Sequence, residues 1–180
     1  LDRRVRSGTW QITPDAPMPA FRSMTFATVG LGRIAQGVLD RARPFGFRLA
    51  AYDPHVSDDA FERAGVDRLD LDALFAEADI VSLHCPLTSE TAHLVSAERL
   101  AQMKPTAILV NTARGGLIDE AALIDTLTHK RIAGAALDVF TEEPVEPDNP
   151  LLRLDNVLPL PHIGGHSEDN LKRMVGHWAS

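Results

Sequence analysis

Cysteine is almost absent from this sequence, and three other features are missing altogether. Cys85 is the single cysteine, so an internal disulfide is excluded, which suits a reducing cytoplasm. No apolar run approaches membrane-spanning length, and no signal peptide is visible. No basic run exceeds two residues and the formal charge is −7, which argues against nucleic acid or an anionic membrane as a partner. We therefore expect a cytoplasmic protein.

What is present is typical of an ordinary globular domain. The chain has 180 residues, and its hydrophobic fraction of 44% is enough for one sizeable core. It begins with Leu rather than Met, so we expect a piece of a longer protein. Residues 1–22 resemble a helix end followed by a proline-rich linker rather than a domain.

The stretch from Met24 to Asp53 carries the pattern that organises the rest. An apolar run leads into Gly30-Leu31-Gly32-Arg33-Ile34-Ala35, then a helical pattern, then a second apolar run that ends on Asp53. Gly30 permits a tight turn, and Gly32 lets the backbone approach a pyrophosphate at a helix N-terminus. Asp53 follows at about 20 residues, where a carboxylate accepts ribose hydroxyls and repels a 2′-phosphate. This stretch predicts an NAD site, while the alternative is an ordinary strand–helix–strand turn without a ligand.

Apolar runs and helical patterns continue to alternate after Asp53. The predicted strands cover Thr25–Val29, Phe47–Tyr52, Ile80–Leu83, Ala107–Val110, Ile132–Val139 and Val157–Leu160, the last an edge or irregular strand because of Pro159. The first helix is expected to bury Ile34, Val38 and Ala42. Such alternation indicates an α/β fold, a doubly wound parallel sheet of the Rossmann type, whose ligands bind at the carboxyl ends of the strands.

Three reactive side chains follow the later strands of this predicted sheet. Arg114 lies in Asn111-Thr112-Ala113-Arg114-Gly115-Gly116, Glu143 follows Asp138, and His162 begins the turn to Gly165. Arginine offers a planar fork to a substrate carboxylate, and histidine exchanges a proton as a ketone is reduced. A carboxylate on the far ring nitrogen fixes the tautomer. Each residue also has a structural interpretation, as a surface arginine, a solvated glutamate or a histidine bonded to a backbone carbonyl.

With these residues in view, the chain resembles the NAD-binding domain of the D-isomer-specific 2-hydroxyacid dehydrogenases. The similar stretches are VGLGRIA, AYDP, IVSLHCPLTSET, MKPTAILVNTARGGLIDEAAL, RIAGAALDVFTEEP, NPLL and NVLPLPHIGG. They cover roughly residues 22–165 in the family's order. The resemblance implies a Rossmann domain over residues 23–166, and a return helix toward a substrate domain in residues 167–180. That substrate domain would be largely absent from this chain.

The resemblance also implies roles for individual residues. Arg114 would bind the substrate, His162 would be the general acid/base, and Glu143 rather than Glu142 would be its partner because the family places this glutamate directly before the proline. The implied cofactor contacts are Gly30, Gly32, Arg33, Ile34, Asp53, Cys85, Pro86, Thr91, Thr112, Ala113, Arg114, Asp138, His162, Gly164 and Gly165. No metal site is expected, because the other histidines lack ligand spacing.

Two classes of protein share this pattern. The first is an NAD-dependent dehydrogenase acting on a small 2-hydroxy or 2-keto acid, as a homodimer. The second is an NADH-sensing dimeric scaffold similar to the C-terminal-binding-protein corepressors, whose distinguishing parts lie outside this chain. Function resides in sites grafted onto folds, so the domain alone leaves both classes open.

Overall fold

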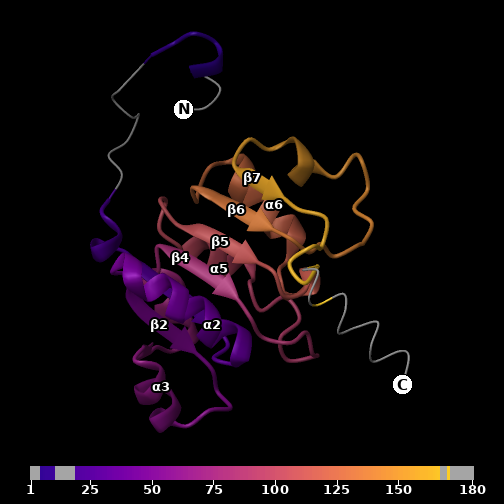
Figure 1. The fold of residues 1–180 in the computed structure, drawn as a ribbon. Coiled ribbons are helices and arrows are strands. Elements are labelled where there is room, and N and C mark those ends of the chain that lie inside the picture. The colour runs from indigo at the N-terminus through magenta and orange to yellow at the C-terminus, as the bar shows by residue number, and fades with distance from the viewer. Residues whose placement is uncertain (1–4, 11–18, 167–169, 171–180) are drawn as a thin grey trace.

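A computed structural model describes residues 5–10, 19–166 and 170. The predictions for residues 1–4, 11–18 and most of 167–180, including the return helix, lie outside the described residues. The described part is one parallel sheet with helices on both faces, as Figure 1 shows.

The sheet has seven strands in the order β3-β2-β1-β4-β5-β6-β7, and every pair is parallel. The strands are β1 Thr25–Val29, β2 Arg48–Tyr52, β3 Asp67–Arg68, β4 Ile80–Leu83, β5 Ile108–Asn111, β6 Gly134–Leu137 and β7 Val157–Pro159. The chain order reverses between β1 and β4, and ligands bind in the crevice at such a switch point. The predicted doubly wound parallel sheet is confirmed.

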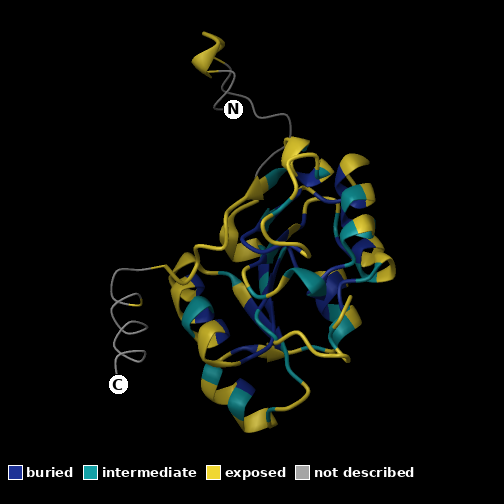
Figure 2. Cartoon of the chain, turned by 90° about the vertical axis from the view of Figure 1, so that its right-hand side faces the viewer, coloured by how far each residue is buried: buried dark blue, intermediate teal, exposed yellow. Residues whose placement is uncertain are grey.

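Helices divide between the two faces of the sheet and bury a separate core on each. One core joins α2 (Arg33–Ala42) and α3 (Asp58–Ala64) to β1 and β2 through Leu39, Phe61 and Ala51. The larger core joins α4 (Leu71–Glu77), α5 (Ala97–Gln102) and α6 (Glu120–Thr128) to the sheet through Phe75, Leu100 and Leu123. The buried strands lie between these helix layers in Figure 2. Every helix among the described residues is too short or too polar to cross a bilayer.

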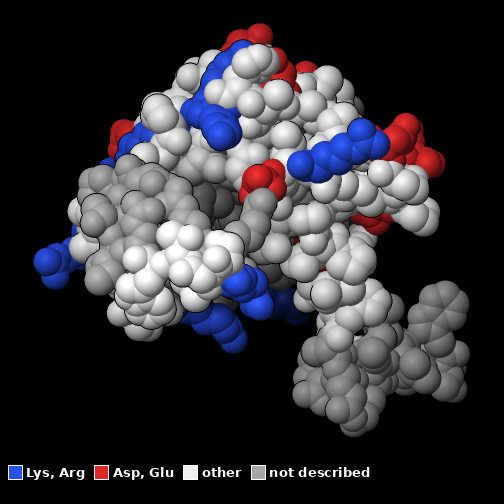
Figure 3. Space-filling view, turned by 90° about the horizontal axis from the view of Figure 1, so that it is seen from above, with Lys and Arg blue, Asp and Glu red and all other residues white. Residues whose placement is uncertain are grey.

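Short 3-10 turns connect several of these helices and strands, and one of them, η4, packs a side chain into the core. They are η1 Phe21–Ser23, η2 Arg43–Phe45, η3 Gly115–Leu117 and η4 Pro150–Arg153. Leu151 of η4 is only 1% exposed, so η4 anchors the long segment between β6 and β7. On the face seen in Figure 3, acidic and basic side chains are interspersed over a largely uncharged surface.

One packing prediction for α2 is wrong. Ile34 is 68% exposed and Val38 is only half-buried; of the three predicted residues Ala42 is buried, together with Ala35 and Leu39. The reason is that Ala35 and Leu39, four residues apart, face the sheet, so that Ile34, one position earlier, is turned about 100° away. Ile34 therefore stands in the first turn of the helix with its side chain in solvent, on the exposed helix start next to Gly32.

Candidate active site

The turn after β1 has room only for glycine at its first position. Gly30 has φ 100°, which L-residues with a side chain rarely adopt. A Cβ there would lie 3.0 Å from the carbonyl carbon and oxygen of His84, which follows the neighbouring strand β4. The Gly30 N–H donates to the carbonyl of Tyr52 at 2.7 Å, which closes the turn onto β2.

The helix start beyond this turn is open. Gly32 is the N-cap of α2, no side chain caps the first turn, and a Cβ at Gly32 would meet nothing within 4 Å. Ala35, in the third position of the glycine pattern, is fully buried against the sheet. Exposed N–H groups and a positive dipole end at a ten-residue helix suit a pyrophosphate.

Asp53 stands at the end of β2 and is held by two backbone groups. Its Oδ2 accepts from Leu31 N–H at 2.8 Å and its Oδ1 from His55 N–H at 2.9 Å. Each carboxylate oxygen has a second lone pair, so both can still accept from a ribose hydroxyl. Gly30, Gly32 and Asp53 line one cleft of about 640 Å³, a volume within the usual range of small-molecule and cofactor sites.

The far wall of this cleft is the loop after β4. Thr91 Oγ1 donates to the carbonyl of Pro86 at 2.7 Å and accepts from Thr88 N–H at 2.8 Å, so the hydroxyl fixes the loop. Cys85, Pro86 and Thr91 all line the cleft. Burial raises the pKa of the Cys85 thiol, which keeps it protonated and makes it a poor nucleophile.

A buried asparagine shapes the loop that carries Arg114. Asn111 ends β5 and is fully buried; its Oδ1 accepts from Ala113 N–H at 3.0 Å, and its Nδ2 donates to the carbonyl of Arg114 at 2.9 Å. Thr112, between them, is exposed. The Arg114 side chain is also exposed, and its Nη1 donates to the Ala113 carbonyl at 2.6 Å.

Glu143 and His162 meet although they lie 19 residues apart. His162 Nδ1 and Glu143 Oε2 are 2.6 Å apart, with side chains 49% and 36% exposed. Glu143 Oε1 accepts from Phe140 N–H at 3.0 Å, so the carboxylate is oriented from both sides. The hydrogen bond from His162, then that from Phe140 N–H, and more weakly the charge of Arg114 lower the pKa of Glu143. The fold thus brings Arg114, Glu143 and His162 into one neighbourhood.

Asp138 holds the turn that presents His162. It is 3% exposed, and its two carboxylate oxygens accept from Ile163 N–H at 2.9 Å and Gly164 N–H at 2.7 Å. His162 itself has φ 55°. A Cβ at Gly164 would lie 2.8 Å from Asp138 Oδ2, so a larger residue would push the turn off its anchor. The carbonyl of Gly165 accepts from Asn170 Nδ2 at 2.9 Å.

The lowered pKa of Glu143 gives a pH prediction. Because the carboxyl pKa lies below its ordinary 4.5, its contribution to folding stability is complete above that value and is lost as the pH falls through the lowered one. We expect the Glu143 carboxyl, followed by carbon-detected NMR, to titrate below 4.5. In a His162→Asn variant the midpoint should rise, because the main cause of the shift is removed. A wild-type midpoint at or above the ordinary value would contradict the contact.

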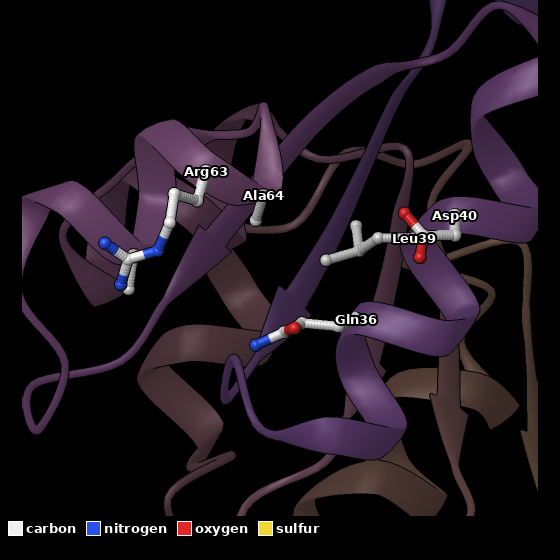
Figure 4. A pocket seen from close by; sticks show the side chains of 6 residues that line it. Gln36, Leu39, Asp40, Arg63 and Ala64 are labelled. Carbon is white, nitrogen blue, oxygen red and sulfur yellow. The ribbon is translucent and has the colours of Figure 1, made fainter.

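A second hollow lies elsewhere on the domain. Figure 4 shows its lining, with Gln36, Leu39 and Asp40 on α2 and Arg63 and Ala64 on α3. The volume of this hollow is about 320 Å³. None of the predicted site residues lines it. Among the described residues, no group of His, Cys, Asp and Glu is arranged to hold a metal ion.

Sequence reasoning missed the hydrogen bonds that three polar residues make around this site: Asn111, Glu120 and Asn149. Glu120 accepts from Thr141 N–H and from Asn149 Nδ2, at either end of the segment that carries Glu143. The available signal for Asn111 was an amide directly after an apolar strand, because a buried amide needs partners. Glu120 gave no such signal, since an acidic residue in the first turn of a helix is ordinary.

The family model described as "D-isomer specific 2-hydroxyacid dehydrogenase, NAD binding domain" matches residues 1–164. The chain is 44% identical over 177 residues to the glyoxylate reductase of Korarchaeum cryptofilum, covering 97% of this chain and 53% of that protein. It is 48% identical over 149 residues to the D-3-phosphoglycerate dehydrogenase of Methanocaldococcus jannaschii, covering 82% and 28%.

A solved structure agrees with these sequence relatives. The D-lactate dehydrogenase of Aquifex aeolicus, complexed with NAD and lactic acid, superposes with a TM-score of 0.88 at 30% identity, over 98% of this chain and 57% of that one. The chain thus spans about half, or less, of the proteins it matches. The resemblance and the NAD cofactor predicted from the sequence are confirmed at the level of the family. The chain belongs to the D-isomer specific 2-hydroxyacid dehydrogenases and contains their NAD-binding domain.

Proposed function

We propose that the whole protein is an NAD-dependent dehydrogenase that interconverts a small D-2-hydroxy acid and its 2-keto acid. The observation that carries the proposal is the 2.6 Å contact between Glu143 and His162, formed beside the Arg114 loop at the carboxyl edge of the sheet. A histidine oriented by a carboxylate, an arginine near it and a dinucleotide cleft on the same edge are the groups that this reaction needs.

Each side chain has a separate task in this proposal. Arg114 binds the substrate carboxylate, and its charge polarises the adjacent C2 carbonyl. Glu143 occupies His162 Nδ1, which leaves Nε2 to give a proton to the C2 oxygen in reduction and to take it back in oxidation. The nicotinamide, when bound, supplies or accepts the hydride at C2. Asp138 keeps the His162 turn in place through two backbone hydrogen bonds.

The cleft residues support NAD in particular. The open start of α2 fits the pyrophosphate, and the Asp53 carboxylate accepts from ribose hydroxyls while it repels a 2′-phosphate. Cofactor contacts by Arg33, Ile34, Cys85, Pro86, Thr91, Thr112, Ala113, Gly164 and Gly165 are part of the same proposal.

This chain spans about half, or less, of the length of its relatives, and we propose that the rest of the whole protein forms a substrate domain. Residues 23–166 would be the cofactor domain, with residues 1–22 and 167–180 leading to a substrate domain that closes the cleft and excludes water. We also propose that the protein is a homodimer. Sedimentation of the whole protein as a monomer at micromolar concentration would refute that part.

The function is tested by NADH oxidation with the whole protein against a panel of 2-keto acids, including glyoxylate, pyruvate and 3-phosphohydroxypyruvate. Turnover on one of them supports the dehydrogenase; the product from pyruvate or 3-phosphohydroxypyruvate should be the D-hydroxy acid, whereas the glycolate formed from glyoxylate has no stereocentre. Tight NADH binding without turnover on any of them would favour the nucleotide-sensing scaffold instead.

A further inference from the structure

The segment that carries Glu143 is exposed and leaves the sheet. From Thr141 to Pro150 every residue except Val145 and Asn149 is exposed to solvent, and this includes Glu143. The hydrogen bond from Phe140 N–H orients the carboxylate, and Val145, two residues after Glu143, packs against the larger core. Because Val145 fixes only the middle of the segment, the position of Glu143 also depends on what holds the two ends at Thr141 and Asn149.

Glu120, the first residue of α6, contacts this segment at both ends. Its Oε2 accepts from Thr141 N–H at 3.3 Å, two residues before Glu143, and its Oε1 accepts from Asn149 Nδ2 at 2.8 Å. Hydrogen bonds to a carboxylate are stronger than those between neutral groups. One side chain on a helix therefore ties together both ends of the exposed segment.

Asn149 continues this connection into the core. Its Oδ1 accepts from Leu151 N–H at 2.9 Å and caps η4, whose Leu151 is buried. The tether thus runs from α6 through Glu120 and Asn149 to η4. Both of its anchors are rigid elements of the domain.

The helix itself does not require Glu120 in this position. Asp119 is already the N-cap of α6, and its side chain accepts from Ala122 N–H at 3.1 Å. An acidic side chain in the first turn interacts with the helix dipole whichever way it points. The two bonds of Glu120 to the Glu143 segment therefore need another explanation.

We propose that Glu120 and Asn149 are positioning residues that hold Glu143 against His162. They act on the reaction only through Glu143, and this inference rests on the function proposed above. Because a small misplacement of a catalytic group is costly, loosening the tether should lower turnover without weakening NADH binding.

A donor–acceptor exchange tests the tether. N149D keeps the cap on Leu151 but sets a second carboxylate against Glu120, and E120Q sets an amide donor against Asn149 Nδ2. In the double variant E120Q/N149D the new amide nitrogen at position 120 donates to the new carboxylate at 149. The carbonyl oxygen of the same amide at position 120 still accepts from Thr141 N–H. The formal charge of the pair equals that of the wild type.

For the whole protein we expect N149D to lower kcat for 2-keto acid reduction by about tenfold to a hundredfold and E120Q by less, with unchanged NADH affinity. The double variant should recover kcat. E142Q removes a charge from the same segment without touching the tether, and should behave as wild type.

Two results would overturn the tether: wild-type kcat in both single variants, or no recovery in the double variant. The titration of the Glu143 carboxyl tests it without turnover. Its midpoint should rise in N149D and return in E120Q/N149D. A rise and return in a protein inactive on every keto acid would keep the tether and refute the proposed function, whereas an unchanged midpoint refutes the tether alone.

Discussion

Replacing His162 with asparagine is expected to lower kcat for 2-keto acid reduction by about 10²- to 10⁴-fold, the usual contribution of a general acid. NADH affinity should fall far less than kcat, because the cleft around Gly32 and Asp53 is lined by other residues and His162 is only one of the implied cofactor contacts. Steady-state NADH oxidation and a fluorescence titration of NADH with the whole protein measure the two quantities.

Asparagine is a better replacement than alanine here because of the backbone. His162 has φ 55°, a conformation that asparagine tolerates more readily than most residues. Asp138 accepts from the backbone N–H groups of Ile163 and Gly164, so the turn keeps its anchor when the ring is removed. The fall in kcat then measures the loss of the imidazole ring and not a collapse of the turn.

His129 offers a matched control for this substitution. Its Nδ1 lies 3.0 Å from Asp125 Oδ1 in an exposed histidine–carboxylate pair at the end of α6. His129→Asn removes the same ring from a similar pair and should leave kcat unchanged. If His162→Asn turned over as fast as His129→Asn, His162 would not be the proton donor.

Much of the fold was predictable from the sequence because buried parallel strands leave a clear pattern. The run Ala107–Val110 is apolar throughout, and helices between such runs favour crossover connections within a single parallel sheet. The two-residue strand β3 was missed, since Asp67 and Arg68 are polar and exposed, and Asp67 meets β2 through an ion pair with Arg48 as well as through the backbone. The exposure of Ile34 was missed because the apolar positions were chosen one residue too early, which turns the predicted face of a helix by about 100°.

The candidate site was predictable as a set of strand ends but not as a set of contacts. Parallel topology places the residues after β1, β5 and β6 on one edge, so Arg114 and Asp138 had to be near each other. The pairing of Glu143 with His162 depends on a segment without regular structure, whose path no periodicity encodes. Asn149 is likewise a loop residue whose partner, Glu120, is remote in sequence.

Replacing Gly115 with alanine is expected to destabilise the protein by about 3 kcal/mol, near the top of the usual range for an overpacked site. A Cβ at Gly115 would lie 2.0 Å from the carbonyl carbon and oxygen of Phe140 and 2.4 Å from Thr141 N. These are backbone atoms, so no side-chain rotation relieves the overlap. The Arg114 turn and the Glu143 segment must move apart, and kcat should fall together with stability.

Gly37→Ala provides a control of opposite sign. Gly37 lies inside α2, where a Cβ would approach the Arg41 guanidinium no closer than 3.4 Å, and alanine in a helix interior stabilises by about 0.5–1 kcal/mol. Urea unfolding of both variants measures the difference, with NADH oxidation alongside. A Gly115→Ala protein with wild-type stability and turnover would show that the two segments do not touch as closely as described. Loss of turnover at retained stability would instead mean that the domain accommodates the methyl group by moving the catalytic segments alone.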